Sequence, residues 1–107
     1  MFRENAKIDP QPAGVNVTRK ILGCGGSLMM VEVTFAKGAA GDPHRHPHEQ
    51  VTYVAKGRFA FTLEGETKTL NPGDSVYIPA NALHGTLALD DGILVDVFTP
   101  IRDDFLK

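Results

Sequence analysis

The sequence predicts an all-β fold, an antiparallel sandwich or barrel of about eight short strands. Apolar and polar residues alternate with a period of two wherever a pattern is visible, which is typical of half-buried strands. Eleven glycines and seven prolines among 107 residues provide frequent turns. Before the short segment that follows Pro100, no stretch of eleven or more residues keeps a helical period without glycine or proline.

Each expected strand carries this alternation or lies next to a turn signal. Every second side chain from Met29 to Phe35 is apolar, and Phe59 and Phe61 repeat the pattern in a later segment. In chain order, the expected strands are residues 15–19, 28–35, 50–55, 58–63, 66–70, 75–78, 83–89 and 93–99.

Three connections have the composition of tight turns. Glu64 and Gly65 form a two-residue hairpin turn, in which the glycine supplies the positive φ. Asn-Pro-Gly-Asp at residues 71–74 and Asp-Asp-Gly at residues 90–92 mark two further turns. The strands on either side of these turns are therefore expected to pair.

The composition limits the partners and the location of the protein. A chain of 107 residues is expected to form one domain, residues 1–107, and its net charge of −2 is too close to neutral for nucleic acid binding. The longest apolar run, residues 21–31, is too short to cross a membrane. The single cysteine, Cys24, forms no intramolecular disulfide, and the first residues lack the apolar region of a signal peptide. We therefore expect a cytoplasmic protein that binds neither nucleic acid nor membranes.

Three of the four histidines, His44, His46 and His48, fall within five consecutive positions. Residues two apart on a strand point to one face, so His44 and His46 are expected to aim at one point. Gln50 has the same parity, and His84 opens a later strand that can approach from across a barrel. Three nitrogens and one oxygen suit a divalent ion such as Zn, Ni, Mn, Co or Fe(II). The alternative is a solvated polar loop, with His84 as a hydrogen-bonded core residue.

If the segment stays extended past Pro47, the oxygen ligand is Gln50, because Glu49 then faces away from the histidines. A bulge at Pro47 would reverse this choice. Neutral ligands leave the double positive charge of the ion unquenched. Such an ion attracts carboxylate or enolate oxygens and is less suited to stabilising a higher oxidation state. The role of His48 stays open between a contact that orients ligand or substrate and a solvated side chain.

A second group of candidate residues lies near the C-terminus. Asp96 and Phe98 share one face of the last expected strand, and burial there would raise the pKa of the Asp96 carboxyl and suit it for proton transfer. Phe98 offers a ring that can stack on a sugar, and Arg102 offers a planar fork for a carboxylate. The alternative places Asp96 on a solvated face, Arg102 in a surface pair with Asp103 or Asp104, and Phe98 in the core.

Two segments resemble the two motifs of the cupin family. The first consists of Gly38, His44, His46, Gln50 and Gly57, and the second consists of Gly73, Pro79 and His84. Gln50 stands where a glutamate ligand is usual, and Asn81 stands where glycine is common, a mild change because asparagine tolerates the left-handed backbone. The resemblance implies a single RmlC-like jelly-roll domain, or double-stranded β-helix, with its barrel core at about residues 27–100.

The His-x-His-Pro-His-Glu-Gln segment and the C-terminal Asp-Val-Phe-Thr-Pro-x-Arg-x-Asp-Phe-Leu segment resemble those of KdgF-type uronate-processing cupins. Those cupins convert 4,5-unsaturated monouronates to linear 4-deoxy-5-keto uronates in pectin and alginate degradation. The resemblance implies one divalent transition metal as cofactor and a small-molecule uronate as substrate. It places the metal ligands at His44, His46, Gln50 and His84. It places the catalytic residues at Asp96, Phe98 and Arg102.

Three other functions are compatible with the sequence: a metal-dependent cupin dioxygenase, a non-catalytic cupin that senses a sugar or effector, and a structural cupin without a functional metal. A homodimer is also expected, because small barrels often close their edges by association. The apolar face formed by Met29, Val31 and Val33 is the expected seam between the two copies.

Overall fold

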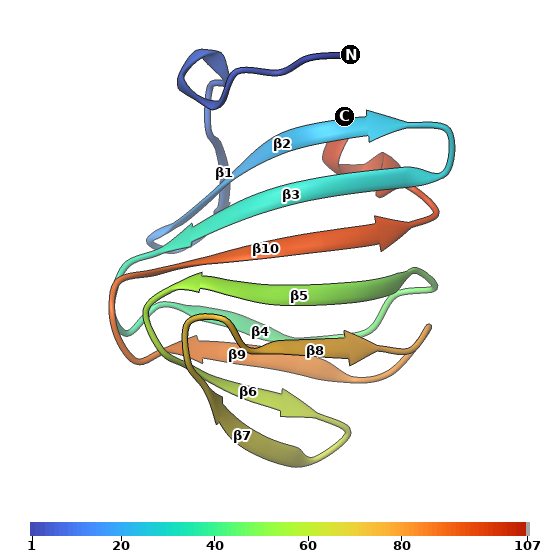
Figure 1. Ribbon diagram of the computed structural model, residues 1–107. Helices are drawn as coiled ribbons and strands as arrows, with labels where there is room; N and C mark the ends of the chain where they lie inside the picture. Colours follow the sequence, from blue (N-terminus) through green and yellow to red (C-terminus); the bar gives the residue numbers. More distant parts are fainter. Residues whose placement is uncertain (107) are drawn as a thin grey trace.

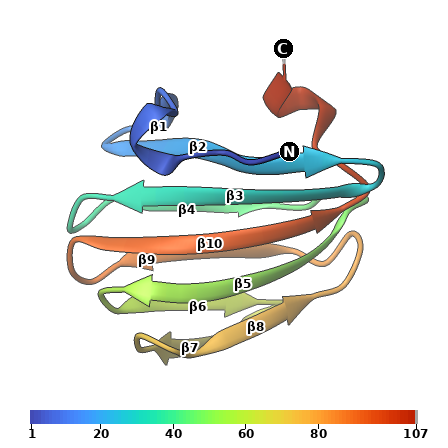
Figure 2. The ribbon, with the colours of Figure 1, turned by 45° about the horizontal axis from the view of Figure 1, so that its top comes forward.

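The computed structural model describes residues 1–106, which contain ten β-strands in two sheets. The six-stranded sheet has the order β1-β2-β3-β10-β5-β8, and the four-stranded sheet has the order β4-β9-β6-β7. Figures 1 and 2 show the two sheets as stacked layers. Every pairing in them is antiparallel, so the predicted all-β jelly roll is confirmed.

Two short 3₁₀-helices flank the barrel, and the C-terminal one folds back beside β2 (Figure 1). Among residues 1–106, no helix has the length and apolar character that a membrane span requires. In chain order, the elements are η1 (Asn5–Lys7), β1 (Gln11–Gly14), β2 (Val17–Gly25), β3 (Leu28–Phe35), β4 (Ala40–His44), β5 (Glu49–Lys56), β6 (Phe59–Leu63), β7 (Glu66–Leu70), β8 (Ser75–Ile78), β9 (His84–Ala88), β10 (Gly92–Thr99) and η2 (Asp103–Leu106).

The sequence patterns miss two strands, β1 and β4. Each contains a proline, Pro12 or Pro43, and neither has a regular apolar alternation. Both strands lie at the edge of their sheet, where a residue without an N–H group breaks no interior hydrogen bond. The first expected strand is also misplaced, because Asn16 adopts a φ of 59° in a turn and β2 begins one residue later.

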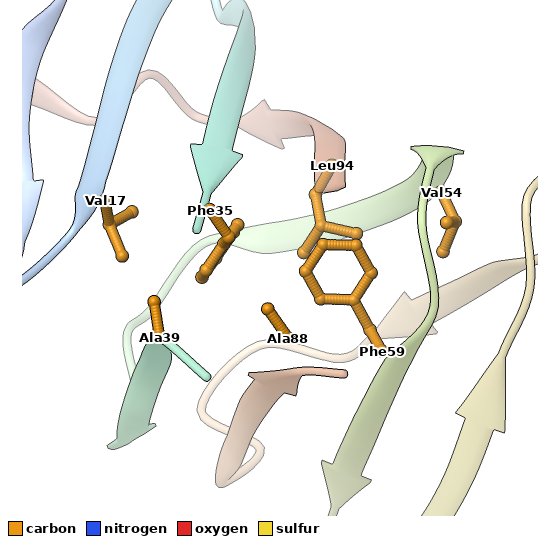
Figure 3. Packing of buried hydrophobic residues seen from close by; sticks show 7 residues of the cluster. All are labelled: Val17, Phe35, Ala39, Val54, Phe59, Ala88 and Leu94. Atoms are coloured by element: carbon orange, nitrogen blue, oxygen red, sulfur yellow. The ribbon is translucent and has the colours of Figure 1, made fainter. Parts of the chain in front are cut away.

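The apolar core and the candidate site occupy opposite ends of the same strands. Leu94 of β10 pairs with Val54 of β5, whereas Phe98, four residues later on β10, pairs with Gln50. The buried cluster around the first end consists of Val17, Phe35, Ala39, Val54, Phe59, Ala88 and Leu94 (Figure 3). Gln50 and its pairing partners Phe98 and Ile78 lie toward the other end, so polar and apolar side chains meet there.

The face formed by Met29, Val31 and Val33 is not available as a dimer seam, so this prediction is wrong. Met29 and Val31 have no exposed surface, because they pack inside the barrel against Ile21 and Phe98. The apolar side chains that the six-stranded sheet leaves exposed lie on its outer face and include Met30, Val51, Tyr53 and Tyr77. The homodimer itself stays a prediction.

Gly57, in the turn between β5 and β6, has a conformation that a larger residue cannot adopt without strain. Its φ is +76°, and a Cβ atom there would lie 2.5 Å from the carbonyl oxygen of Asp91. We expect Gly57→Ala to lower the free energy of unfolding by about 2 kcal/mol or more, measured by urea denaturation. Gly65→Ala is the matched control, because Gly65 has a φ of +84° but nothing within 4 Å of the added atom. Equal losses in the two variants would contradict a role for the close approach.

Candidate metal centre and substrate cavity

Three histidines meet at the end of the barrel where Gln50 lies. His44, the last residue of β4, pairs with His84, the first residue of β9, and their ring centroids are 4.4 Å apart. His46 follows β4 and lies in no strand, so strand parity alone does not explain its position. One ligand atom from each of the three residues lies within 4.8 Å of the others.

Backbone carbonyl groups fix the tautomer of all three rings. Each Nδ1 lies within hydrogen-bond distance of a carbonyl oxygen, and a carbonyl can only accept. Each neutral ring therefore carries its proton on Nδ1 and has a lone pair on Nε2, the form in which imidazole binds metals. The acceptors and distances are Asp42 at 3.0 Å for His44, His48 at 3.1 Å for His46, and Ala82 at 2.9 Å for His84.

Burial favours the neutral form of the His46 and His84 rings. It lowers the pKa of His46 to about 4, and the positive charge of Arg102 acts in the same direction. Burial also lowers the pKa of His84. The Nε2 atom of His84 is buried and has no hydrogen-bond partner among the described residues. A buried polar atom without a partner is costly, so this nitrogen is suited to a ligand that the protein itself does not supply.

A chain of hydrogen bonds orients the amide of Gln50, which is 6% exposed. The hydroxyl of Thr52 donates to Oδ1 of Asp96 at 2.6 Å, which leaves its oxygen to accept from Nε2 of Gln50 at 2.8 Å. Since the amide nitrogen is held by Thr52, the amide oxygen faces the histidines. It lies 3.0 Å from Nε2 of His46.

This arrangement fits a cation. With the His46 proton on Nδ1, a nitrogen lone pair and an amide oxygen face each other, and two such groups repel unless a positive charge lies between or beside them. The same ion would also satisfy the buried Nε2 of His84. Three imidazole nitrogens and one amide oxygen are therefore suitable ligands for a divalent transition metal, with positions left for water or substrate.

The residues next to these ligands have different environments. Glu49 is exposed and accepts a hydrogen bond from the hydroxyl of Tyr77, away from the histidines. His48 is half-buried, and its backbone oxygen orients the ring of His46. The geometry therefore favours Gln50 over Glu49 as the oxygen ligand. It gives His48 an orienting contact with His46 through its main chain.

A cavity of about 580 Å³ lies beside the histidines, and its size is typical of small-molecule sites. His44, Gln50 and His84 line it together with Asp96. The Asp96 side chain keeps some exposed surface, but burial of its carboxyl raises its pKa to about 6 against the opposing effect of the Thr52 hydrogen bond. Asp96 is therefore not on the solvated outer face that the alternative proposed.

Arg102 and Phe98 also line the cavity. The Arg102 guanidinium donates through Nε and Nη2 to both oxygens of Asp104, at 3.0 and 2.8 Å. The alternative expected from the sequence was a surface pair of Arg102 with Asp103 or Asp104. The pair with Asp104 forms, but the Arg102 side chain is only 12% exposed and stacks on Phe98 and Phe105. Phe98 is 2% exposed, so it is both a core residue and part of the cavity wall.

Among the side chains that line the cavity, Arg19, Thr52 and Phe105 were not predicted from the sequence. Thr52 was detectable, because it has the strand parity of Gln50 and is a polar residue on an inward face. Arg19 has the parity of the buried Val17, which is a weaker signal. The position of Phe105 depends on how the C-terminal segment folds back, and no local pattern predicts that.

A family model described as Cupin domain matches residues 31–98 of the sequence. The chain belongs to the cupin family. The matched segment of this cupin runs from β3 to β10 and includes all four candidate metal ligands.

This cupin is 46% identical over 95 residues to the "Pectin degradation protein KdgF" of Dickeya dadantii (strain 3937), covering 87% of this chain and 86% of that protein. The structure of KdgF from Halomonas sp. matches with a TM-score of 0.94 and 41% identity, over 98% of this chain and 97% of the other. An RmlC-like cupin from Shewanella frigidimarina NCIMB 400 matches with a TM-score of 0.94 and 38% identity, over 97% and 94%. The resemblance to KdgF-type cupins and the RmlC-like fold are confirmed.

Proposed function

We propose that this protein is a metal-dependent enzyme that opens the ring of 4,5-unsaturated monouronates to give linear 4-deoxy-5-keto uronates. The similarity to a pectin degradation protein supports the substrate class. The observation that carries the reaction type is the hydrogen-bonded chain from Gln50 through Thr52 to Asp96, which links a carboxyl group of raised pKa to the candidate metal ligands. All these side chains come from the one domain expected over residues 1–107.

His44, His46, Gln50 and His84 would hold the metal. When bound, a divalent ion would supply a positive charge, undamped by any carboxylate ligand, that stabilises negative charge on substrate oxygens. The protein supplies the rest: a preset tautomer at each imidazole and an amide oxygen whose direction Thr52 fixes.

Asp96 moves the proton. The unsaturated uronate is a cyclic hemiacetal, and its opening begins when the Asp96 carboxylate accepts the proton of the hydroxyl at C1. The C1 carbonyl forms as the bond from C1 to the ring oxygen breaks, which leaves an enolate. Asp96 then returns the proton to C4, and the enolate becomes the ketone. The product is an isomer of the substrate, so no oxidant, reductant or water is consumed.

The raised pKa of Asp96 suits both halves of this proton transfer. A carboxyl with a pKa of about 6 is mostly ionised at pH 7 and is a stronger base than an exposed aspartate. Arg102 contributes positive charge on the same wall, where the uronate carboxylate would bind, and Phe98 packs beside the sugar ring.

The proposed reaction is tested by following the ultraviolet absorbance of the conjugated C=C bond of unsaturated galacturonate. Metal-loaded protein is expected to remove this absorbance, and protein treated with a chelator is expected to act far more slowly. Consumption of dissolved oxygen with a diketone or flavonoid substrate would instead indicate a dioxygenase. Tight uronate binding without turnover would indicate a sensing protein. Either result would contradict the proposal.

The pH dependence of ring opening should follow the protonation of Asp96. The carboxylate must accept a proton, so kcat/KM is expected to fall about tenfold per pH unit once the pH drops below about 6. Metal content is measured in the same samples, because protonation of the imidazoles also releases metal. A rate that stays constant down to pH 4.5 with metal bound would contradict the role of Asp96.

A further inference from the structure

A second arginine, Arg19 of β2, lines the same cavity as Arg102. The two guanidinium groups share one aromatic side chain: the Cζ of Arg19 lies 3.8 Å from the ring centroid of Phe105, and that of Arg102 lies 4.2 Å from it. Phe105 belongs to η2, which folds back beside β2 (Figure 1). Two segments far apart in the sequence therefore bring two positive charges to one wall.

The two arginines differ in their partners. Arg102 uses Nε and Nη2 for a two-pronged contact with Asp104. Arg19 donates its Nε to the amide oxygen of Gln11 at 3.2 Å, a neutral partner. Within residues 1–106, no carboxylate lies within ion-pair distance of Arg19, and its Nη groups donate no hydrogen bond.

This environment is unfavourable for a cation without a further partner. Arg19 is half-buried, and burial lowers the pKa of its guanidinium; the charge of Arg102 adds to this effect, whereas Asp104 opposes it. Asp104 pairs with Arg102, whereas no carboxylate among residues 1–106 pairs with Arg19, so the Arg19 charge lacks a counter-ion at contact distance. A single carboxylate from a ligand would balance it and would accept the unused Nη hydrogens.

We propose that Arg19 is a substrate-binding residue that, together with Arg102, holds the carboxylate of the acidic sugar. The assignment rests on the proposed function and refines it, because the charge selectivity of the cavity then depends on Arg19. Phe105 and Gln11 act as positioning residues, which hold the Arg19 guanidinium at the cavity wall through stacking and one hydrogen bond.

The test compares Arg19→Met with the wild type, since methionine keeps an apolar stem of similar length against Phe105. The KM for unsaturated galacturonate is expected to rise about 10- to 100-fold, while kcat changes less than about threefold, because the lost contact binds substrate and transition state alike. Wild-type protein should prefer the acid over its methyl ester, and Arg19→Met should lose most of that preference. Arg19→Lys should recover part of it, because the charge is restored without the fork.

Lys20→Met is the matched control for removal of a positive charge. The Lys20 ammonium binds Asn5, away from the cavity, so its loss should leave KM and the acid–ester preference unchanged. Metal content and the urea midpoint are measured for every variant. They exclude a KM change that comes from a disturbed metal site or fold.

Calorimetric titration with galacturonate and with galactose separates this inference from the proposed reaction. If the wild type binds galacturonate but does not turn over unsaturated galacturonate, and Arg19→Met weakens that binding, the reaction is wrong and the role of Arg19 stands. If turnover occurs but KM and the acid–ester preference are the same in Arg19→Met, the role of Arg19 is overturned and the reaction stands. If the wild type neither turns over nor binds the acidic sugar, both are overturned.

Discussion

Asp96→Asn is expected to reduce the kcat of ring opening by about 10²–10⁴-fold, the usual contribution of a general acid–base group. Asparagine has the shape of aspartate, and its Oδ1 atom can still accept the hydrogen bond that Thr52 donates at 2.6 Å. The chain from Thr52 to the Gln50 amide then persists, so the direction of the amide oxygen is retained. What is lost is the charge and the ability to take up a proton.

The measurement is the steady-state rate with unsaturated galacturonate, together with the metal content and the urea midpoint of the variant. Asp103→Asn is the matched control, because Asp103 is exposed, lies in η2 and does not line the cavity. It should keep the wild-type rate. If Asp96→Asn protein opened the substrate at the wild-type rate with its metal bound, another residue would have to move the proton.

Much of the candidate site could be predicted from the sequence because its residues lie on regular strands. His84 and Gln50 point into the barrel for the same reason that their apolar strand neighbours do: side chains of equal parity share a face. Asp96 and Phe98 follow the same rule on β10, between β3 and β5. The exposure of Glu49 follows from the same rule, because Glu49 directly precedes Gln50 and its side chain points to the opposite face.

The remaining parts depend on contacts that a local pattern does not contain. His46 lies outside any strand, and its position is set by a hydrogen bond to the carbonyl of His48 and by burial. The choice of Asp104 over Asp103 as the partner of Arg102 depends on the turn of η2. The cluster of Arg19, Arg102 and Phe105 requires the chain after β10 to fold back onto β2, a tertiary event.

The Asn81 position shows where a departure from the family pattern is harmless. The cupin motif commonly has glycine there, and Asn81 adopts a φ of 65°, the left-handed conformation that asparagine tolerates better than most residues. The Gln50 departure is different, because it changes chemistry: an amide in place of a carboxylate removes one negative charge from the candidate ligand set. The sequence alone reveals that difference, and the structure adds the reason that the amide oxygen points at the histidines.

The His44→Ala, His46→Ala double variant is expected to lose both metal and activity. Two imidazole nitrogens are removed from a set of three nitrogens and one oxygen, and the remaining His84 and Gln50 are too few to hold a divalent ion. Changes to groups that merely orient ligands already cost about 10–100-fold in metal affinity, so loss of two ligands should cost more. Elemental analysis after dialysis should find less than about a tenth of the wild-type metal.

His48→Ala is the control variant, because it removes a histidine from the same segment without removing a proposed metal ligand. His48 contributes an edge-on ring contact with His46 and a backbone oxygen that accepts from Nδ1 of His46; the backbone oxygen is kept when the ring is removed. This variant should therefore retain its metal through the same dialysis, although the same segment has been altered. Metal retained at the wild-type level in the double variant would refute the ligand assignment. Because the His84 Nε2 would then remain buried without a partner, another group would have to be found that satisfies it.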